Sequence, residues 1–446
     1  MILQFSVSNF RTFRGLQTLN LAANSHDKSL PDNCITTDLP GLKVKRWIKG
    51  VALYGANASG KTTVLTALAY LTHLVKNSAK ITDPREPILE IDSFALAPEE
   101  SETPTAFGVT FVAEGVRYEY RVAATRERIW HESLRAFPKV KEQLWFNRDW
   151  SPETGSYTWS PERPSGFQRD TQLEGYTLSN MLFLSKAVAN NRVDLEPVFR
   201  WFNEHLQFLD PSVKNIFGRG FTLNQIELQS PLHARIVNLL RYADIGVTGA
   251  RAVEQQFSDE SLKRLAANMP TEVWEKYHKE RWQLPELVHR AHGEMRVPLP
   301  WRLESLGTQA LFALAGPWLD ILERGLTVCV DELETSLHPH IVRELLRLFF
   351  SAEENPKGAQ IIFTTHNPLL LDPTLLRRDQ VWFTEKDDDG SAHLYPLTDY
   401  QPRKGESLAR GYLAGRYGAV PFVPSGLLGS FPNFETEGSV EKAAHE

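Results

Sequence analysis

The sequence predicts an α/β fold whose core is divided between two distant segments of the chain. Near the amino end, an apolar run over residues 51–53 leads into a glycine-rich turn and a helical pattern over residues 61–76. Far downstream, a helical run over residues 310–322 is followed by apolar strands at 326–330 and 360–364. Strands that alternate with helices favour an α/β fold, with one mixed sheet formed from residues 1–76 and 300–400. We therefore expect both segments to build one core, with the intervening chain as an insertion.

The glycine-rich turn has the composition of a phosphate-binding loop. Two glycines let the backbone curl so that successive N–H groups point at phosphates, and a strand before and a helix after are the context that such a loop requires. Lys61 is expected to reach the outer phosphates and Thr62 to supply an oxygen to magnesium. An ordinary glycine-rich turn explains the flanking elements less well. The predicted binding residues are Gly55, Ala56, Asn57, Ala58, Ser59, Gly60, Lys61, Thr62 and Thr63.

A pair of carboxylates closes the downstream strand at 326–330. Asp331 is placed to hold Mg²⁺ together with Thr62, and Glu332 to orient or deprotonate an attacking water. His366 follows the next strand, where it can contact the terminal phosphate, although a surface histidine is the plain alternative. Glu332, His366 and Lys61 are the predicted catalytic residues.

A Ser-x-Gly turn precedes the downstream helix. Ser305 and Gly307 combine a hydroxyl, free N–H groups and the positive end of the helix dipole, which is a second anion-binding arrangement. Ordinary helix capping is the alternative, because serine and glycine are common capping residues. The position of this turn just before the carboxylate strand favours a phosphate contact.

Composition limits the class of protein. The chain has 446 residues, of which 42% are hydrophobic and 23% charged, and a net charge of −6. This indicates a globular protein with more than one core, no membrane span, no secretory leader and a cytoplasmic location. Cys34 and Cys329 are expected to stay reduced. The negative charge gives no general attraction to nucleic acid, and the basic run over residues 43–49 favours a solvated face over a nucleic-acid patch.

The expected domain order follows these motifs. Residues 1–76 form the first half of the core, 77–299 an insertion, 300–400 the second half and 401–446 a tail. Within the insertion, 86–135 is predicted as a β arm and 136–299 as an irregular and helical region, with 145–170 irregular and 250–290 helical. The aromatic side chains at 145–159 favour a satellite core over a base-stacking platform. The acidic run over 385–389 favours a polar turn over a metal cluster.

These motifs together resemble the SMC, RecF and ABC-type P-loop ATPases. Their GxNxSGK[ST] pattern is matched from Gly55 to Thr62, and the signature turn in reduced form by Ser305 and Gly307. The opening Asn9-Phe-Arg-Thr-Phe13 is similar to the entry of RecF-like proteins. More narrowly, stretches at 182–185, 304–308, 334–339 and 412–421 resemble the RloA or AbiL-type abortive-infection ATPases of the AAA family. Two departures are Leu306 in place of the second signature glycine and no clear glutamine lid residue.

The resemblance implies an ABC-type P-loop NTPase with a split ATPase core and an inserted β arm plus helical domain. It also implies ATP and Mg²⁺ as cofactors and a head-to-tail dimer or larger homo-oligomer, in which the signature turn completes a neighbour's site. The absence of an N-K-x-D motif favours ATP over GTP.

Three functions fit such an ATPase. One is the sensor or regulatory scaffold of an anti-phage abortive-infection system, triggered by phage or nucleic acid, that controls a separate toxic effector, a TOPRIM or RloB-like nuclease. Another is a RecF-like DNA-repair or DNA-loading ATPase. A third, a nuclease of the overcoming-lysogenization type, needs its own TOPRIM domain, and only 80 residues follow His366 (446 minus 366). The defence function is favoured.

Overall fold

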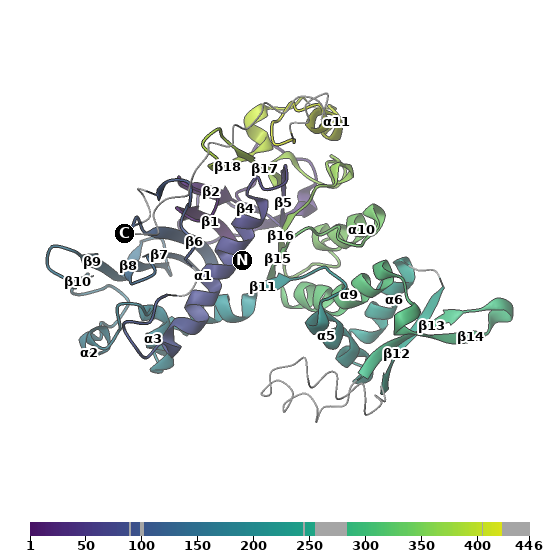
Figure 1. Ribbon diagram of the computed structural model, residues 1–446, viewed down its shortest axis with the longest axis horizontal. Coiled ribbons are helices and arrows are strands. Elements are labelled where there is room, and N and C mark those ends of the chain that lie inside the picture. Colours follow the sequence, from purple (N-terminus) through teal and green to yellow (C-terminus); the bar gives the residue numbers. More distant parts are fainter. Residues whose placement is uncertain (89–90, 99–101, 244–245, 255–282, 404, 422–446) are drawn as a thin grey trace, which may run out of the picture.

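The computed structural model describes residues 1–88, 91–98, 102–243, 246–254, 283–403 and 405–421. It is an α/β structure in which an antiparallel sheet, a mixed core sheet and a helical region lie in succession (Figure 1). The fold class predicted from the sequence is confirmed. Among the described helices, none combines the length and apolar character needed to cross a bilayer.

The core sheet has six strands in the order β11-β15-β16-β5-β17-β18. Its parallel strands β5 (Gly50–Gly55), β15 (Thr327–Val330), β16 (Gln360–Thr364) and β17 (Val381–Lys386) come from the two distant segments, as expected. Every residue of β5, β15 and β16 is buried, because parallel strands are covered on both faces. β18 (Ala392–Pro396) closes one edge antiparallel, and β11 (Leu206–Leu209) joins the other edge.

A seven-stranded antiparallel sheet forms the neighbouring layer, in the order β10-β9-β8-β7-β6-β1-β2. Two hairpins of this sheet are β1 with β2 and β6 with β7. The strands are β1 (Ile2–Ser8), β2 (Gln17–Asn20), β6 (Thr105–Ala113), β7 (Val116–Ala124), β8 (Ile129–Phe137), β9 (Gln143–Ser151) and β10 (Ser156–Ser160).

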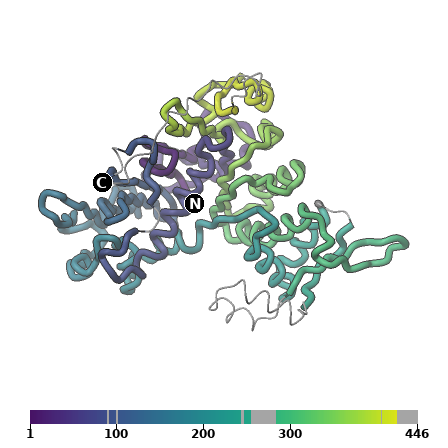
Figure 2. Tube along the Cα trace, viewed as in Figure 1, coloured from purple at the N-terminus to yellow at the C-terminus, as the bar shows by residue number. Residues whose placement is uncertain are grey.

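Helix α1 (Lys61–Asn77) lies between these two sheets. Alternate residues of β5 show the layering, since Val51 and Leu53 pack with α1 and the antiparallel sheet, whereas Ala52 and Tyr54 pack on the opposite side. That opposite side is covered by α9 (Leu306–Arg324) and α10 (Pro339–Phe350). The core sheet is therefore the middle layer, with one hydrophobic core on each of its faces. The edge at which its parallel strands end is called the carboxyl edge below. Figure 2 follows the chain through these layers.

A helical region extends from the core sheet beyond β11. Helix α5 (Ile216–Glu227) packs along α9, with the hydroxyl of Thr222 accepting a hydrogen bond from the N–H of Gly316 at 3.0 Å. Helix α6 (His233–Ala243) follows, and then a small sheet of β12 (Val247–Glu254), β13 (Gln283–Arg290) and β14 (Arg296–Pro300). The smaller helices α2 (Thr171–Gly175), α3 (Phe183–Ala189) and α4 (Glu196–Arg200) lie by the antiparallel sheet (Figure 1).

Three expectations from the sequence were wrong. β1 and β2 do not join the core sheet. Instead, β1 pairs with β2 on one side and with β6 of the predicted β arm on the other, while its apolar face lies toward α1. Most of the predicted irregular region 145–170 is the β9–β10 hairpin, which its aromatic residues favour. The described ends of the predicted helix at 250–290 are strands, in which cross-strand pairing overrides their charge; residues 255–282 lie outside the described part.

Several smaller expectations are confirmed. Trp145 stacks on Phe167 in a buried aromatic cluster, as a satellite core requires. The acidic run after β17 forms a turn closed by the N–H of Gly390 on the carbonyl of Asp387. Both cysteines are free.

The carboxyl-terminal segment packs back on the core. Tyr412 of α11 (Leu408–Leu413) lies against Tyr54 and Phe383 with ring centroids 5.4 and 5.7 Å apart, and Tyr417 also lies against Phe383. These tyrosines are therefore part of the core. The tail aromatics Phe422, Phe431 and Phe434 lie outside the described residues.

Candidate nucleotide-binding site

The glycine-rich turn joins β5 to α1 at the carboxyl edge of the core sheet. Gly55 and Gly60 are required there, since a Cβ on Gly55 would lie 2.4 Å from Ser59 Oγ and the φ of Gly60 is 107°. Ser59 is held by Thr384 of β17, with hydroxyl oxygens 2.7 Å apart. The predicted loop residues from Gly55 to Thr63 therefore form a narrow cradle of backbone at the edge where ligands bind in open α/β sheets.

Lys61 folds back over this loop. Its ammonium group donates to the carbonyl oxygens of Gly55 and Ala56 at 2.9 and 2.8 Å. Burial lowers the pKa of Lys61, and the carboxylates of the downstream segment, from Asp331 to Glu334, act in the opposite direction. The cation is thus positioned inside the loop with its charge balanced by carboxylates from the second half of the core.

The two halves meet at Thr62 and Asp331. The Thr62 hydroxyl lies 3.1 and 3.0 Å from the two carboxylate oxygens of Asp331, although 269 residues separate them. Thr364 at the end of β16 donates to Asp331 Oδ1 at 2.6 Å. Hydroxyl and carboxylate oxygens are the ligands that Mg²⁺ prefers. The structure therefore brings together the two side chains that the sequence predicted as metal ligands.

Glu332 has a left-handed backbone with φ of 49°, a strained conformation for a non-glycine residue. The same Thr364 hydroxyl accepts a hydrogen bond from the Glu332 N–H at 2.7 Å. His366 lies just after β16 with its side chain exposed, and its backbone N–H donates to Glu334 Oε1 at 2.5 Å. Glu332 and His366 therefore both lie at the carboxyl edge, on the same side as the phosphate loop.

Sequence reasoning missed four residues of this edge. Thr364 and Glu334 tie together the predicted residues, and the second carboxylate oxygen of Glu334 is buried without a hydrogen-bond partner among the described residues. Thr12, in the turn after β1, bonds Thr63 through their hydroxyls at 3.0 Å. Asp210 follows β11 and lines a cavity of about 480 Å³ with Asp331 and Glu332. The only signal in the sequence was that these residues lie at or beyond the ends of strands, and this signal could be used only once the order of the strands in the sheet was known.

The predicted signature turn does not touch the phosphate loop of its own chain. Ser305 caps α9, since its hydroxyl accepts from the Thr308 N–H at 3.1 Å. A Cβ on Gly307 would lie 3.1 Å from the carbonyl oxygen of Ser336, in the loop after the carboxylates. Within the described residues, no hydrogen bond joins Ser305 or Gly307 to residues 55–63. Both are accessible to a partner outside this chain.

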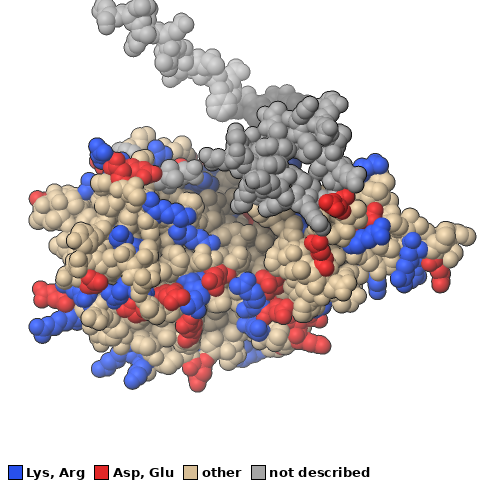
Figure 3. All heavy atoms as spheres, turned by 90° about the horizontal axis from the view of Figure 1, so that it is seen from below, with Lys and Arg blue, Asp and Glu red and all other residues tan. Residues whose placement is uncertain are grey.

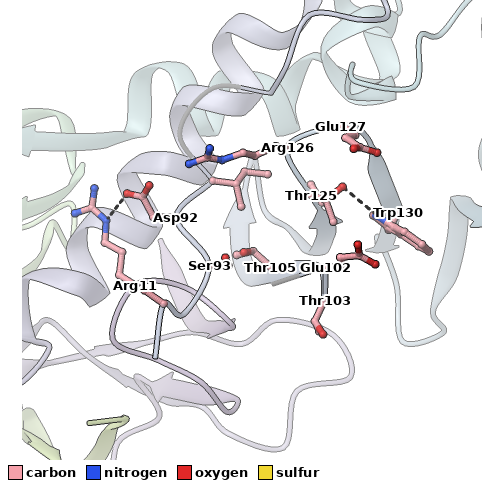
Figure 4. A pocket seen from close by; sticks show the side chains of 13 residues that line it. Arg11, Asp92, Ser93, Glu102, Thr103, Thr105, Thr125, Arg126, Glu127 and Trp130 are labelled. Carbon is pink, nitrogen blue, oxygen red and sulfur yellow. Dashed lines mark hydrogen bonds and ion pairs between the residues drawn. The ribbon is translucent and has the colours of Figure 1, made fainter. Parts of the chain in front are cut away.

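A separate cavity of about 820 Å³ opens beside the amino-terminal turn (Figure 4). In that view Arg11 and Asp92 point toward one another, and their ion pair measures 3.2 Å. Arg126 lies above them, and Glu102 and Glu127 line the opposite part. Because two guanidinium groups face three carboxylates, this cavity has no positive charge in excess that would attract phosphate.

Residues 51–372 match the model of a protein family described as "AAA domain, putative AbiEii toxin, Type IV TA system". The chain belongs to this family. Its predicted class, a P-loop ATPase of the AAA type related to abortive-infection proteins, is thereby confirmed at the level of the family, whereas the narrower RloA or AbiL type stays a prediction.

Among solved structures, the SMC head domain from Thermotoga maritima is similar at 13% identity, with a TM-score of 0.38, over 89% of this chain and 98% of that chain. That score is too low to carry a functional inference. No curated protein sequence matches the chain.

Proposed function

We propose that this chain binds ATP with Mg²⁺, hydrolyses it, and uses the cycle to control a separate effector in an anti-phage abortive-infection system. The observation that carries the ATPase part is the contact of Thr62 with Asp331, which unites a phosphate loop with a carboxylate strand. The defence role rests on membership of a family described with a toxin–antitoxin system.

The phosphate loop binds the triphosphate through its backbone N–H groups and Lys61. Thr62 and Asp331 hold Mg²⁺, which when bound neutralises charge on the phosphates during transfer. The cradle fits this group, because Gly55 and Gly60 keep the space that a Cβ would fill. Thr364 fixes the direction of Asp331, so that its carboxylate faces Thr62.

Glu332 orients and deprotonates the attacking water, and His366 contacts the terminal phosphate. The exposed side chain of Glu332 is available to a ligand, while its backbone is fixed by Thr364. His366 is attached through its N–H to Glu334, so the histidine and the carboxylate loop move together. A change in the terminal phosphate is then transmitted to the loop that contains Ser336, beside Gly307.

Hydrolysis requires a second copy of the chain, whose Ser305 and Gly307 complete the site. Two apolar side chains, at the starts of the packed helices α5 and α9, are uncovered in the single chain. Phe217 at the start of α5 is 85% exposed and Leu306 at the start of α9 is 63% exposed. We infer that both side chains contribute to the contact with the second copy. Head-to-tail association would bury them when ATP is bound and expose them after hydrolysis.

The effector that this cycle controls is a separately encoded protein, for which a TOPRIM or RloB-like nuclease is the expected class. Direct action on DNA, as in RecF-like repair, is the second candidate. On the face shown in Figure 3, basic and acidic side chains of the described residues are interspersed, and none of its visible part is a broad basic surface. That distribution favours a protein partner over a duplex.

The test combines Glu332→Gln with the neighbouring gene product. The variant should bind ATP but hydrolyse it about 10²-fold more slowly, because the general base is lost. An effector that co-purifies with the chain and is released by ATP from the unmodified protein, but not from Glu332→Gln, supports the proposal. ATP-stimulated binding to DNA junctions without a protein partner would replace it with the repair function. Equal hydrolysis rates would remove Glu332 from the mechanism.

A further inference from the structure

Another cavity lies near the amino ends of the core strands, opposite the edge that carries the phosphate loop. It measures about 800 Å³ and is bordered by the loop at 24–29, the segment at 373–378, the segment at 398–402 and Gly405. Arg377 and Arg378 lie just before the amino end of β17, whereas Thr384 near its carboxyl end contacts Ser59 of the phosphate loop. At about 3.3 Å per residue, the length of β17 keeps the two sites roughly 20 Å apart.

The walls of this cavity are fixed by a buried ion pair. Arg377 is fully buried and donates to both carboxylate oxygens of Asp379, at 2.9 and 2.6 Å. Its remaining guanidinium nitrogen donates to the carbonyl oxygens of Asp27 and Ser29 at 3.3 and 2.5 Å, which holds the loop that contains Lys28. Asp379 also accepts from the N–H of Asn24 at 2.7 Å. A pocket with walls held in this way is formed before any ligand arrives.

Positive charge exceeds negative charge on the lining. Lys28 and the ring of His26 have no hydrogen-bond or ion-pair partner in the part of the chain that the structure describes, and Arg378 donates only to the carbonyl oxygen of Arg403 at 3.0 Å. The one lining carboxylate, Asp27, accepts from the N–H and hydroxyl of Ser29 at 2.8 and 2.7 Å. Burial opposes its ionisation, but these hydrogen bonds and the charges of Arg377 and Arg378 lower the pKa of Asp27.

We propose that this cavity is a second ligand site that binds a small phosphorylated molecule through Lys28, His26 and Arg378. Two cations that form no ion pair with the described residues, together with an imidazole, line this cavity, and such groups recognise phosphate oxygens. The apolar side chains of Pro373, Leu376 and Pro402 cover the rest of the ligand. The volume lies in the range of roughly 300–1,000 Å³ that holds small molecules, and the enclosure suits such a ligand better than an acidic peptide.

The test is isothermal titration of inorganic pyrophosphate into the full chain. We expect two classes of binding. Lys61→Ala removes the class at the phosphate loop, whereas Lys28→Glu weakens the other class by about tenfold or more, because a charged hydrogen bond becomes a repulsion. Arg378→Gln should weaken the same class. Lys43→Glu, at an exposed lysine outside the cavity, is the matched control and should leave both classes unchanged.

Each other result overturns the proposal. Loss of all pyrophosphate binding in Lys61→Ala would mean that only the phosphate loop binds it. Equal weakening by Lys28→Glu and Lys43→Glu would indicate general attraction to a charged surface. Binding of a hexaglutamate peptide in place of pyrophosphate, with sensitivity to Lys28→Glu, would make the cavity a protein-docking site. If the proposed ATPase function is wrong, the result is different: the unmodified protein lacks only the class of pyrophosphate binding that depends on Lys61, and the class that depends on Lys28 remains.

Discussion

Thr364 joins the two adjacent carboxylate residues of the site through one hydroxyl group. It donates to Asp331 Oδ1 at 2.6 Å and accepts from the N–H of Glu332 at 2.7 Å. The side chain is fully buried at the end of β16, between the strand that ends in the carboxylates and the strand that leads into the phosphate loop. One threonine therefore determines both the direction of the proposed metal ligand and the backbone of the proposed general base.

Thr364→Val should lower the ATPase rate at least about tenfold while the protein stays folded. Valine keeps the shape of threonine, but Asp331 and the Glu332 N–H each lose a partner, at a cost of about 1–3 kcal/mol in the free energy of unfolding. Turnover and thermal unfolding measured side by side check this. Thr364→Ser retains the hydroxyl and should recover most activity. Unchanged turnover in Thr364→Val would show that Thr364 does not position the carboxylates.

Lys61→Ala should abolish nucleotide binding. The ammonium group of Lys61 is the cation inside the phosphate loop, and in the absence of ligand it is held by the carbonyl oxygens of Gly55 and Ala56. Fluorescent ATP titration measures the loss. Lys76→Ala, on the last turn of the same helix, is the control and should bind ATP normally. Tight binding to Lys61→Ala would contradict the assignment of the loop.

Ser305→Arg should leave ATP binding intact but stop hydrolysis, because a bulky cation would occupy the place where the neighbour's terminal phosphate docks. Since Ser305 also caps α9, Ser305→Asp separates the two effects: it keeps a cap but repels phosphate, and should also be inactive. Mixing Ser305→Arg with Lys61→Ala should restore part of the activity through hybrid sites. A co-assembled mixture without ATPase activity would rule out the shared site.

Acid should destabilise the protein through His205, at the end of the short π-helix Trp201–His205 before β11. Burial, followed by the positive charges of the amino terminus and Arg324, lowers the pKa of His205 to about 4 from 6.5. At a pH between these two pKa values, His205 is protonated in the unfolded chain but neutral in the folded chain, so the free energy of unfolding falls as the pH drops below about 6.5. His205→Gln should reduce the decrease of the melting temperature between pH 6.5 and pH 5, whereas the control His73→Gln, at an exposed histidine, should leave that decrease unchanged. Parallel curves for His205→Gln and the unmodified protein would exclude this residue.

Local sequence was sufficient to predict the phosphate loop and the carboxylate pair. The pattern of β5, the turn and α1 is contiguous, and its glycines are needed for backbone conformations that other residues adopt at a cost. Asp331, Glu332 and His366 were found because each directly follows an apolar strand. In a parallel sheet the carboxyl ends of all strands share one edge, so the sequence also placed these residues together.

Residues whose roles depend on a distant neighbour could not be predicted in this way. Thr364 is an ordinary strand residue until β16 pairs with β15, and Asp210 is an ordinary loop residue until β11 joins the same edge. The sheet to which β1 belongs was also mispredicted, because an alternating strand can pair with any other alternating strand and only packing against α1 selects the partner.

The sequence by itself determined the glycine-rich turn between β5 and α1 and the carboxylates after β15, since their types and spacing within each short segment are dictated by backbone geometry; their roles at a triphosphate stay predictions. Only the tertiary structure decided which side chains support them, which tyrosines of the tail belong to the core, and where unpaired cations gather. Those features come from contacts between distant segments, such as Arg377 with the carbonyl oxygen of Asp27, 350 residues away, and no local pattern records them.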